Sequence, residues 1–202
     1  MFRLYLLHCG MKRSTTTSSL DWTQMLGLCA ELKRDGLHRD YLLIMMGCHF
    51  GLRISDLLKL TWNDVYKQES VIVKEGKTGK QRIINEHARV REALEFSKPH
   101  LLTGADITTD HPILANRWGS ALTVSYINKR LKWVFSRYRI KTQNASSHTL
   151  RKTFGKRVYE MNGETDKSLV FLSEIFGHSN TAITRRYLGI TQEEIADAYL
   201  SL

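Results

Sequence analysis

Residues 70–85, SVIVKEGKTGKQRIIN, interrupt a chain whose hydrophobic pattern is otherwise helical. Two β-rich runs, Val71–Val73 and Arg82–Ile84, flank a turn that is rich in glycine and lysine. Runs of this kind on either side of a glycine-containing turn predict a β-hairpin. The sequence therefore predicts a mostly α-helical fold with one small antiparallel β-sheet (an α+β fold), and the tip of its hairpin is strongly basic.

Hydrophobic residues at helical spacing predict three helices before the hairpin. The first follows a serine cap at Ser18 or Ser19 and stops at Gly36. The second, YLLIMMGCHF at residues 41–50, is apolar on nearly every side, so we expect it at the centre of the core. A short third helix is expected over ISDLLKL, residues 54–60.

Helical patterns return after the hairpin and continue to the C-terminus. Gly163 and Gly189 stand where glycines commonly end helices. The expected helices cover about residues 86–97, 121–138, 147–162, 167–176, 180–188 and 191–200. We expect a flexible N-terminal arm at residues 1–19, one folded domain at 20–190 and a tail helix at 191–202.

The charge balance of the chain favours a polyanionic partner. Thirty Lys and Arg residues against twenty Asp and Glu residues give 202 residues a net charge of +10 and a pI near 9.6. Such an excess is typical of nucleic-acid-binding proteins, although net charge alone leaves open a basic protein without such a partner.

Neither a disulfide framework nor a membrane anchor is indicated. Cys9, Cys29 and Cys48 are odd in number and show no CxxC spacing, so free thiols are expected. The apolar run at the N-terminus is too short for a signal peptide and lacks a cleavage site. Because no stretch approaches about 18 apolar residues, we expect a cytoplasmic protein that does not bind membranes.

Two stretches carry basic residues at element boundaries. In GLRISDLLKL, residues 51–60, Asp56 follows Arg53 by three residues and can orient its guanidinium; the alternative is an ordinary surface ion pair. In EGKTGKQR, residues 75–82, Lys77 stands in the hairpin turn. The glycine spacing there does not fit a nucleotide-binding P-loop, and a plain charged turn is the alternative.

Two further stretches combine histidine with arginine or tyrosine. In SSHTLRKTF, residues 146–154, a serine caps a helix whose first turn presents His148 and Arg151 on one face, an arrangement that favours anions. In FGHSNTAITRRYLG, residues 176–189, Tyr187 follows His178 by nine residues. Neither histidine has a carboxylate or cysteine at ligand spacing, so no metal or cofactor is expected.

In their order along the chain, these stretches resemble the tyrosine recombinase family of lambda-type phage integrases and their relatives. GLRISDLLKL is similar to the family's first arginine motif and HTLR to its His-x-x-Arg box. IFGHSNTAITRRYLG is similar to its Leu-Gly-His box followed by the nucleophilic tyrosine. The resemblance covers about residues 20–190, and it implies the catalytic-domain fold of these enzymes.

The resemblance also implies a role for each motif residue. Tyr187 would attack a scissile DNA phosphate and form a 3′-phosphotyrosine bond, leaving a free 5′-hydroxyl that can reseal the joint without ATP or metal. Arg53 and Arg151 would hold the non-bridging oxygens as charged forks, and His178 would add a donor. The other implied roles are His148 as general base, Lys77 as the acid that protonates the leaving 5′-oxygen and Asp56 as a support for Arg53.

Duplex DNA is the implied partner, with assembly into a tetramer on DNA and a monomer in free solution. Relatives usually carry an N-terminal core-binding domain, whereas about twenty residues precede the first helix here, so the chain is either a fragment or an unusually short member. Lys152 stands where relatives often have histidine. The basic residues expected to contact DNA are Lys74, Lys80, Arg82, Lys152 and Arg185.

Rival interpretations are a non-enzymatic helical DNA-binding regulator, a metal-dependent nuclease and, within the family, a strand-relaxing topoisomerase. The regulator does not account for the lysine, the two histidine–arginine sets and the tyrosine together. An unbroken helix would separate His178 from Tyr187 by about 13 Å. We therefore expect the tyrosine on a separate or mobile turn, with its movement controlling the reaction.

Overall fold

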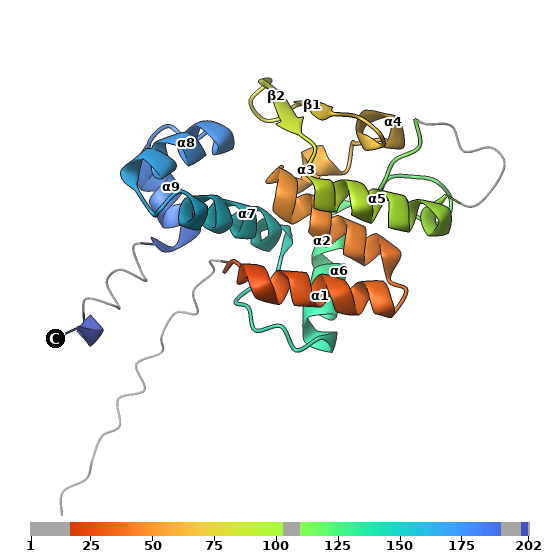
Figure 1. The fold of residues 1–202 in the computed structure, drawn as a ribbon, viewed down its shortest axis with the longest axis horizontal. Coiled ribbons are helices and arrows are strands. Elements are labelled where there is room, and N and C mark those ends of the chain that lie inside the picture. The colour runs from red at the N-terminus through yellow and green to blue at the C-terminus, as the bar shows by residue number, and fades with distance from the viewer. Residues whose placement is uncertain (1–16, 103–109, 191–198, 202) are drawn as a thin grey trace, which may run out of the picture.

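The computed structural model describes residues 17–102, 110–190 and 199–201. Its fold is mostly helical with one hairpin early in the chain, as the sequence predicts (Figure 1). In chain order they are α1 (Trp22–Arg34), α2 (His38–Phe50), α3 (Ile54–Leu57), α4 (Trp62–Val65), β1 (Ser70–Lys74), β2 (Gln81–Asn85), α5 (Ala88–Leu101), α6 (Val124–Arg137), α7 (Ser147–Met161), α8 (Asp166–Phe176) and α9 (Thr181–Leu188).

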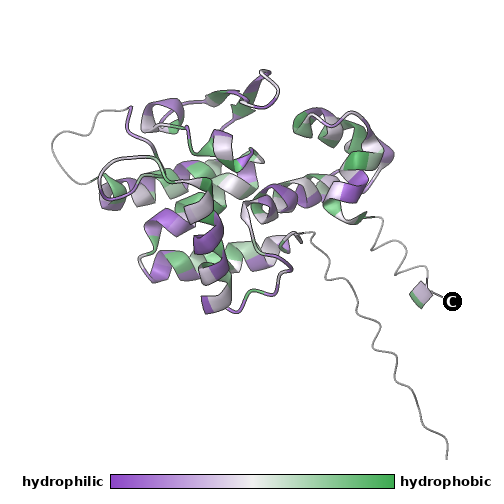
Figure 2. Ribbon diagram, turned by 180° about the vertical axis from the view of Figure 1, so that it is seen from behind, coloured by the Kyte–Doolittle hydropathy of each residue, from purple (hydrophilic) through white to green (hydrophobic). Residues whose placement is uncertain are grey.

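Helix α2 lies at the centre of the larger hydrophobic core. Its side chains are buried on nearly every side, as the apolar run predicts, and it packs against α1, α5 and α7. Polar and apolar residues instead share the outer helices (Figure 2). Gly47 of α2 lets α7 approach closely, because a Cβ at this position would lie 2.6 Å from a methyl group of Leu150. The close approach fixes the start of α7 against the core.

The hairpin rests on this core through one face of β1. Strands β1 and β2 pair antiparallel from Ser70 opposite Asn85 to Lys74 opposite Gln81, which confirms the predicted hairpin to within a residue at each strand end. Val71 and Val73 are buried, whereas Ile72 between them faces solvent. Burial of alternate residues anchors β1, so the turn that joins the strands projects beside α3 (Figure 1).

Helices α8 and α9 form a smaller hydrophobic cluster of their own. α7 starts in the larger core and leads away from it to α8 and α9 (Figure 1). The buried members of the smaller cluster are Tyr159, Leu169, Leu172, Phe176, Leu188 and Ile190. Because α7 belongs to both clusters, it connects α3 and the hairpin with the unit that carries His178 and Tyr187.

Several expected boundaries were wrong. Asp21, not Ser18 or Ser19, caps α1 and accepts a hydrogen bond from the backbone N–H of Gln24. Ser18 instead bonds to the loop before α7, through Gln143. The third helix, expected over residues 54–60, is the single turn α3, which ends at Leu57. A capping box at Thr61 then starts a separate helix, α4.

Helix α5 continues through Pro99 to Leu101, beyond the expected end at residue 97. The boundaries of α7, α8 and α9 were predicted to within one residue. Most of the expected arm at residues 1–19 and of the tail at 191–202 lies outside the described residues.

Candidate active site

One cavity brings together all six residues that the sequence singles out for catalysis. It has a volume of about 470 Å³ and lies between α3, the hairpin turn, α7 and the α8–α9 unit. Four separate stretches of the chain contribute the six: Arg53, Lys77, His148, Arg151, His178 and Tyr187. The fold therefore places an arginine pair, a lysine, two histidines and a tyrosine around a space large enough for a phosphate group.

The two arginines converge on one main-chain oxygen. Nη2 of Arg53 donates to the carbonyl oxygen of Phe176 at 3.1 Å, and Nη2 of Arg151 donates to the same oxygen at 3.2 Å. Phe176 ends α8, just before Gly177 in the left-handed conformation. The carbonyl thus ties both guanidinium groups to the segment that carries His178.

Arg151 retains an unused donor in the site. Its side chain is buried, and Nη1 has no hydrogen-bond partner among the described residues. Burial lowers the pKa of Arg151 to about 10, and nearby Arg53 and Arg82 act in the same direction, whereas Tyr187 and Glu75 oppose them. The group remains charged at neutral pH, and a buried charged N–H without a partner favours an anionic ligand.

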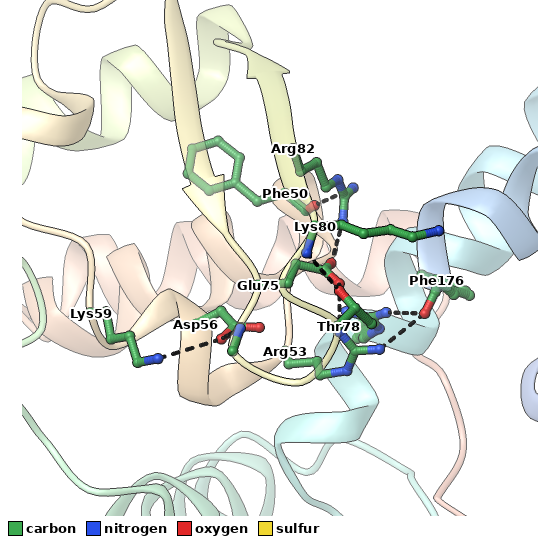
Figure 3. A network of polar contacts seen from close by, with 11 residues as sticks. Phe50, Arg53, Asp56, Lys59, Glu75, Thr78, Lys80, Arg82 and Phe176 are labelled. Atoms are coloured by element: carbon green, nitrogen blue, oxygen red, sulfur yellow. Dashed lines mark hydrogen bonds and ion pairs between the residues drawn. The ribbon is translucent and has the colours of Figure 1, made fainter. Parts of the chain in front are cut away.

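Glu75 is a member of the site that the sequence did not reveal. Its carboxylate accepts from Nη1 of Arg53 at 2.7 Å and from the hydroxyl of Thr78 at 2.9 Å, and Arg82 lies 3.9 Å away (Figure 3). Burial by itself would raise the pKa of Glu75, but the hydrogen bonds from Arg53 and Thr78 outweigh it and hold the pKa below its ordinary value. The carboxylate is therefore ionised at neutral pH.

Asp56 does not make the predicted contact with Arg53. Its Oδ1 accepts from the backbone N–H of Gly76 at 3.0 Å and lies 3.9 Å from Nζ of Lys59 (Figure 3). The one-turn helix α3 directs Asp56 toward the hairpin, and Arg53 forms its ion pair with Glu75 instead. Asp56 thus supports the turn that carries Lys77, and it does so through the backbone.

The two histidines are neutral at physiological pH. Burial lowers the pKa of His178, and the nearby cations Arg151, Arg53 and Lys77 lower it further. Partial desolvation lowers the pKa of His148 in the same way, with Arg151 and Lys152 adding to the effect. Nδ1 of His178 lies 2.9 Å from the hydroxyl of Thr184, which fixes the ring. Neutral imidazoles can accept a proton.

Tyr187 is close to His178 because the chain between them is not one helix. Gly177 ends α8, Asn180 caps α9, and the tyrosine stands in the last turn of α9, so the rings of His178 and Tyr187 lie 5.4 Å apart. The phenolic oxygen is buried and has no hydrogen-bond partner among the described residues. Burial raises the pKa of Tyr187 to about 12, although Arg151 and Arg53 pull it down.

The five basic residues expected on DNA fall into different environments. Lys74 and Lys80 are exposed on the hairpin. Arg82 is largely buried, with Nη2 donating to the carbonyl of Phe50 at 3.0 Å. Lys152 is also buried, and its ammonium donates to the carbonyl of Thr17 at 2.6 Å.

Arg82 is thus half-buried and Lys152 buried, so both expose less of the side chain than Lys74 and Lys80 do. Contacts distant in the sequence enclose both side chains. Lys152 also lies 5.2 Å from the ring centre of Tyr187. Arg185 forms an ion pair with Asp166 at 3.3 Å.

Comparison with known proteins agrees with this geometry. A model of the phage integrase family matches residues 18–194. The chain belongs to the phage integrase family. It is 31% identical over 170 residues to the probable integrase/recombinase YoeC of Bacillus subtilis (strain 168), covering 80% of this chain and 83% of that protein.

This family member also resembles longer recombinases. It is 27% identical over 161 residues to the tyrosine recombinase XerC of Xanthomonas axonopodis pv. citri (strain 306), covering 80% of this chain and 50% of XerC. The chain thus spans about half the length of several XerC proteins that it matches.

Solved structures show the same fold at lower sequence identity. The crystal structure of XerA recombinase superposes with a TM-score of 0.68 and 20% identity, covering 91% of this chain and 64% of XerA. A post-cleavage complex of XerH with a palindromic difH substrate has a TM-score of 0.65 and 21% identity, covering 90% and 52%. The mostly helical fold with one small antiparallel sheet is therefore that of tyrosine recombinases.

Two features are absent from the described residues. No helix in this part of the chain combines the length and hydropathy that crossing a membrane requires. No group of three or more His, Cys, Asp or Glu side chains within the same residues is arranged to hold a metal ion.

Proposed function

We propose that this protein is a site-specific DNA recombinase that cleaves and rejoins strands through a 3′-phosphotyrosine intermediate. One observation supports this most strongly. Six residues from four stretches of the chain line a single cavity, and within it a buried guanidinium N–H and a buried phenol lack partners among the described residues. A phosphodiester supplies an acceptor for the first and an electrophile for the second.

The arginines act on the non-bridging oxygens of the scissile phosphate. Attack by a phenolate adds negative charge to these oxygens in the transition state, and fixed cationic donors stabilise it. Arg53 and Arg151 are already oriented by the Phe176 carbonyl and Glu75, so little reorganisation is needed when DNA binds. His178 adds a further donor from the segment that follows Phe176.

Proton transfer is divided between His148 and Lys77. The neutral imidazole of His148 accepts the proton of Tyr187 as the phenol attacks phosphorus. Lys77 protonates the 5′-oxygen as the P–O bond breaks, which leaves a neutral hydroxyl. In rejoining, a 5′-hydroxyl attacks the phosphotyrosine bond and the two proton transfers run in reverse.

The tyrosine must move, or its surroundings must open, before it reacts. Its oxygen is buried, and burial keeps it protonated with a pKa of about 12. Helix α9 belongs to the smaller cluster, so it can shift on α7 without disturbing the larger core. This supports control of the nucleophile by movement.

Duplex DNA is the proposed partner, because several similar structures are recombinases in complex with DNA and because this chain carries ten excess positive charges. We further propose a monomer in free solution and a tetramer on paired DNA sites. Sedimentation of the protein with and without a duplex that carries its site tests this. A stable tetramer without DNA would contradict it.

A denaturing gel tests the proposed activity. The protein is incubated with a nicked duplex in EDTA, so that a short strand diffuses away after cleavage and the covalent complex accumulates. We expect a protein–DNA adduct that survives denaturation and disappears on digestion with protease.

The rival functions give different results in this assay and in three companion assays. A mobility shift on a native gel without an adduct indicates a DNA-binding regulator, and cutting that requires a divalent cation indicates a nuclease. Relaxation of supercoiled DNA that carries no specific site indicates a topoisomerase. Any of these three outcomes contradicts the recombinase assignment.

A further inference from the structure

Glu75 is a buried carboxylate that none of the proposed catalytic steps uses. It is 4% exposed and stands at the start of the hairpin turn, between β1 and Lys77. Burying a charge is costly unless it is paired and hydrogen-bonded, so its position calls for a physical explanation.

Its contacts join two parts of the site that are separate in the sequence. Oε2 accepts from Nη1 of Arg53 and from the hydroxyl of Thr78, one residue after Lys77. The backbone of Glu75 also closes the turn, because its N–H donates to the carbonyl of Lys80 and its carbonyl accepts from the N–H of Gly79. One carboxylate therefore contacts both an oxyanion-binding arginine and the turn that carries the proposed acid (Figure 3).

The same carboxylate lies among three buried or half-buried cations. Arg53 and Arg82 are within 4 Å of it, and Arg151 joins Arg53 at the Phe176 carbonyl. Without a negative charge between them, these guanidinium groups would repel one another in a region of low polarity. Glu75 offsets this repulsion, and Nη1 of Arg151 stays without a hydrogen-bond partner among the described residues.

We propose that Glu75 is a positioning residue that fixes the guanidinium of Arg53 and the turn of Lys77 as one unit. The arginine that stabilises the oxyanion and the lysine that protonates the leaving oxygen are then held at a fixed distance from each other. This inference rests on the proposed recombinase function. It differs from the support expected of Asp56, which reaches the turn only through the backbone of Gly76.

The test compares three variants in single-turnover cleavage of a nicked duplex, with protein in excess over its measured Kd. Glu75→Ala removes both contacts, and Glu75→Gln keeps an acceptor of the same shape without the charge. Thr78→Val keeps the contact of Glu75 with Arg53 and removes the link to the turn, together with the hydroxyl that accepts from the backbone N–H of Lys80 at 3.4 Å. Glu160→Gln, which changes an exposed carboxylate on α7, is the matched control.

Each variant is measured on ordinary DNA and on DNA with sulfur in place of the bridging 5′-oxygen, a leaving group that needs no proton. On ordinary DNA we expect Glu75→Ala to cleave about 100-fold more slowly and Glu75→Gln about tenfold more slowly, at unchanged DNA affinity. Sulfur should restore Thr78→Val nearly fully but Glu75→Ala only in part, because the loss at Arg53 remains.

The outcomes separate this inference from the proposed function. If the wild-type protein forms no adduct, the recombinase function fails. If it does, and Glu75→Ala cleaves like Glu160→Gln, Glu75 has no positioning role. The proposed link between Arg53 and the turn of Lys77 is also wrong if Thr78→Val and Glu75→Gln each cleave the sulfur-containing DNA as slowly, relative to the wild type, as ordinary DNA. A purely structural loss would give this result, because it does not depend on the leaving group. These two variants keep the test decisive should Glu75→Ala not fold.

Discussion

Arg53 and Arg151 donate to the same atom, the carbonyl oxygen of Phe176, although one begins α3 and the other stands in the first turns of α7. Two guanidinium groups that share an acceptor are held close together despite their like charges. Glu75 balances this pair from the hairpin side. The two guanidinium groups are therefore preorganised on one side of the site, as binding of a tetrahedral oxyanion requires.

Tyr187→Phe should abolish the covalent protein–DNA adduct while DNA binding persists, because only the attacking oxygen is lost. The structure adds an expectation about stability. Since the buried hydroxyl has no partner among the described residues, its removal should leave the free energy of unfolding unchanged or raise it by about 1 kcal/mol. Adduct gels and urea melts measure the two effects.

Tyr199→Phe is the matched control for this change, because Tyr199 is 76% exposed. It should leave both the adduct and the melt as in the wild type. Adduct that persists in Tyr187→Phe and disappears in Tyr199→Phe would transfer the nucleophile role to Tyr199.

Lys77→Ala should slow cleavage of ordinary DNA by roughly 10²–10⁴-fold, the usual loss of a general acid. The defect should shrink strongly on DNA with a bridging 5′-sulfur. Lys132→Ala, which changes an exposed lysine on α6, is the control and should cleave normally. Equal defects of Lys77→Ala on both substrates would remove Lys77 from the acid role and make Lys80 the next candidate.

Lys80→Met and Lys152→Met should differ in the salt dependence of DNA binding. Lys80 is exposed on the hairpin turn, so its loss should reduce the slope of log K against log salt by about 0.9, the value for one phosphate contact. Lys152 is buried and bonded to Thr17, so its loss should leave the slope unchanged. Binding titrations at four salt concentrations distinguish the two. A smaller slope for Lys152→Met would show that DNA binding exposes this ammonium.

His49 should make the fold sensitive to acid. Its ring packs beside Trp22, Nδ1 donates to the carbonyl of Met45 at 2.7 Å, and burial lowers its pKa from 6.5 to about 4. Between these values the unfolded chain binds the proton and the folded one does not, so the stabilisation present above pH 6.5 is lost as the pH falls toward 4.

The shift corresponds to about 3 kcal/mol in the free energy of unfolding. Denaturant melts of the wild type and of His49→Gln at pH 7 and pH 4.5 measure it. The loss between the two pH values should be smaller in His49→Gln by about this amount. The same acid sensitivity in both proteins would assign it to other groups.

The sequence by itself determined most of the elements and the six motif residues at the cavity. Apolar spacing in α2, the two β-rich runs of the hairpin and the serine cap of α7 are local signals, because each reflects contacts within a few residues along the chain. The motif residues were recognisable from their types and order, and the structure places all six at one cavity.

Only the tertiary structure decided the partners of these residues. Arg53 pairs with Glu75 and not with Asp56, because packing of the hairpin beside α3 sets this contact across the fold. A glutamate in a charged turn looks solvated in sequence, as Lys152 does on a basic helix, and long-range contacts bury both. The Phe176 carbonyl gives no signal in sequence, since every residue has one and only the fold brings two arginines to it.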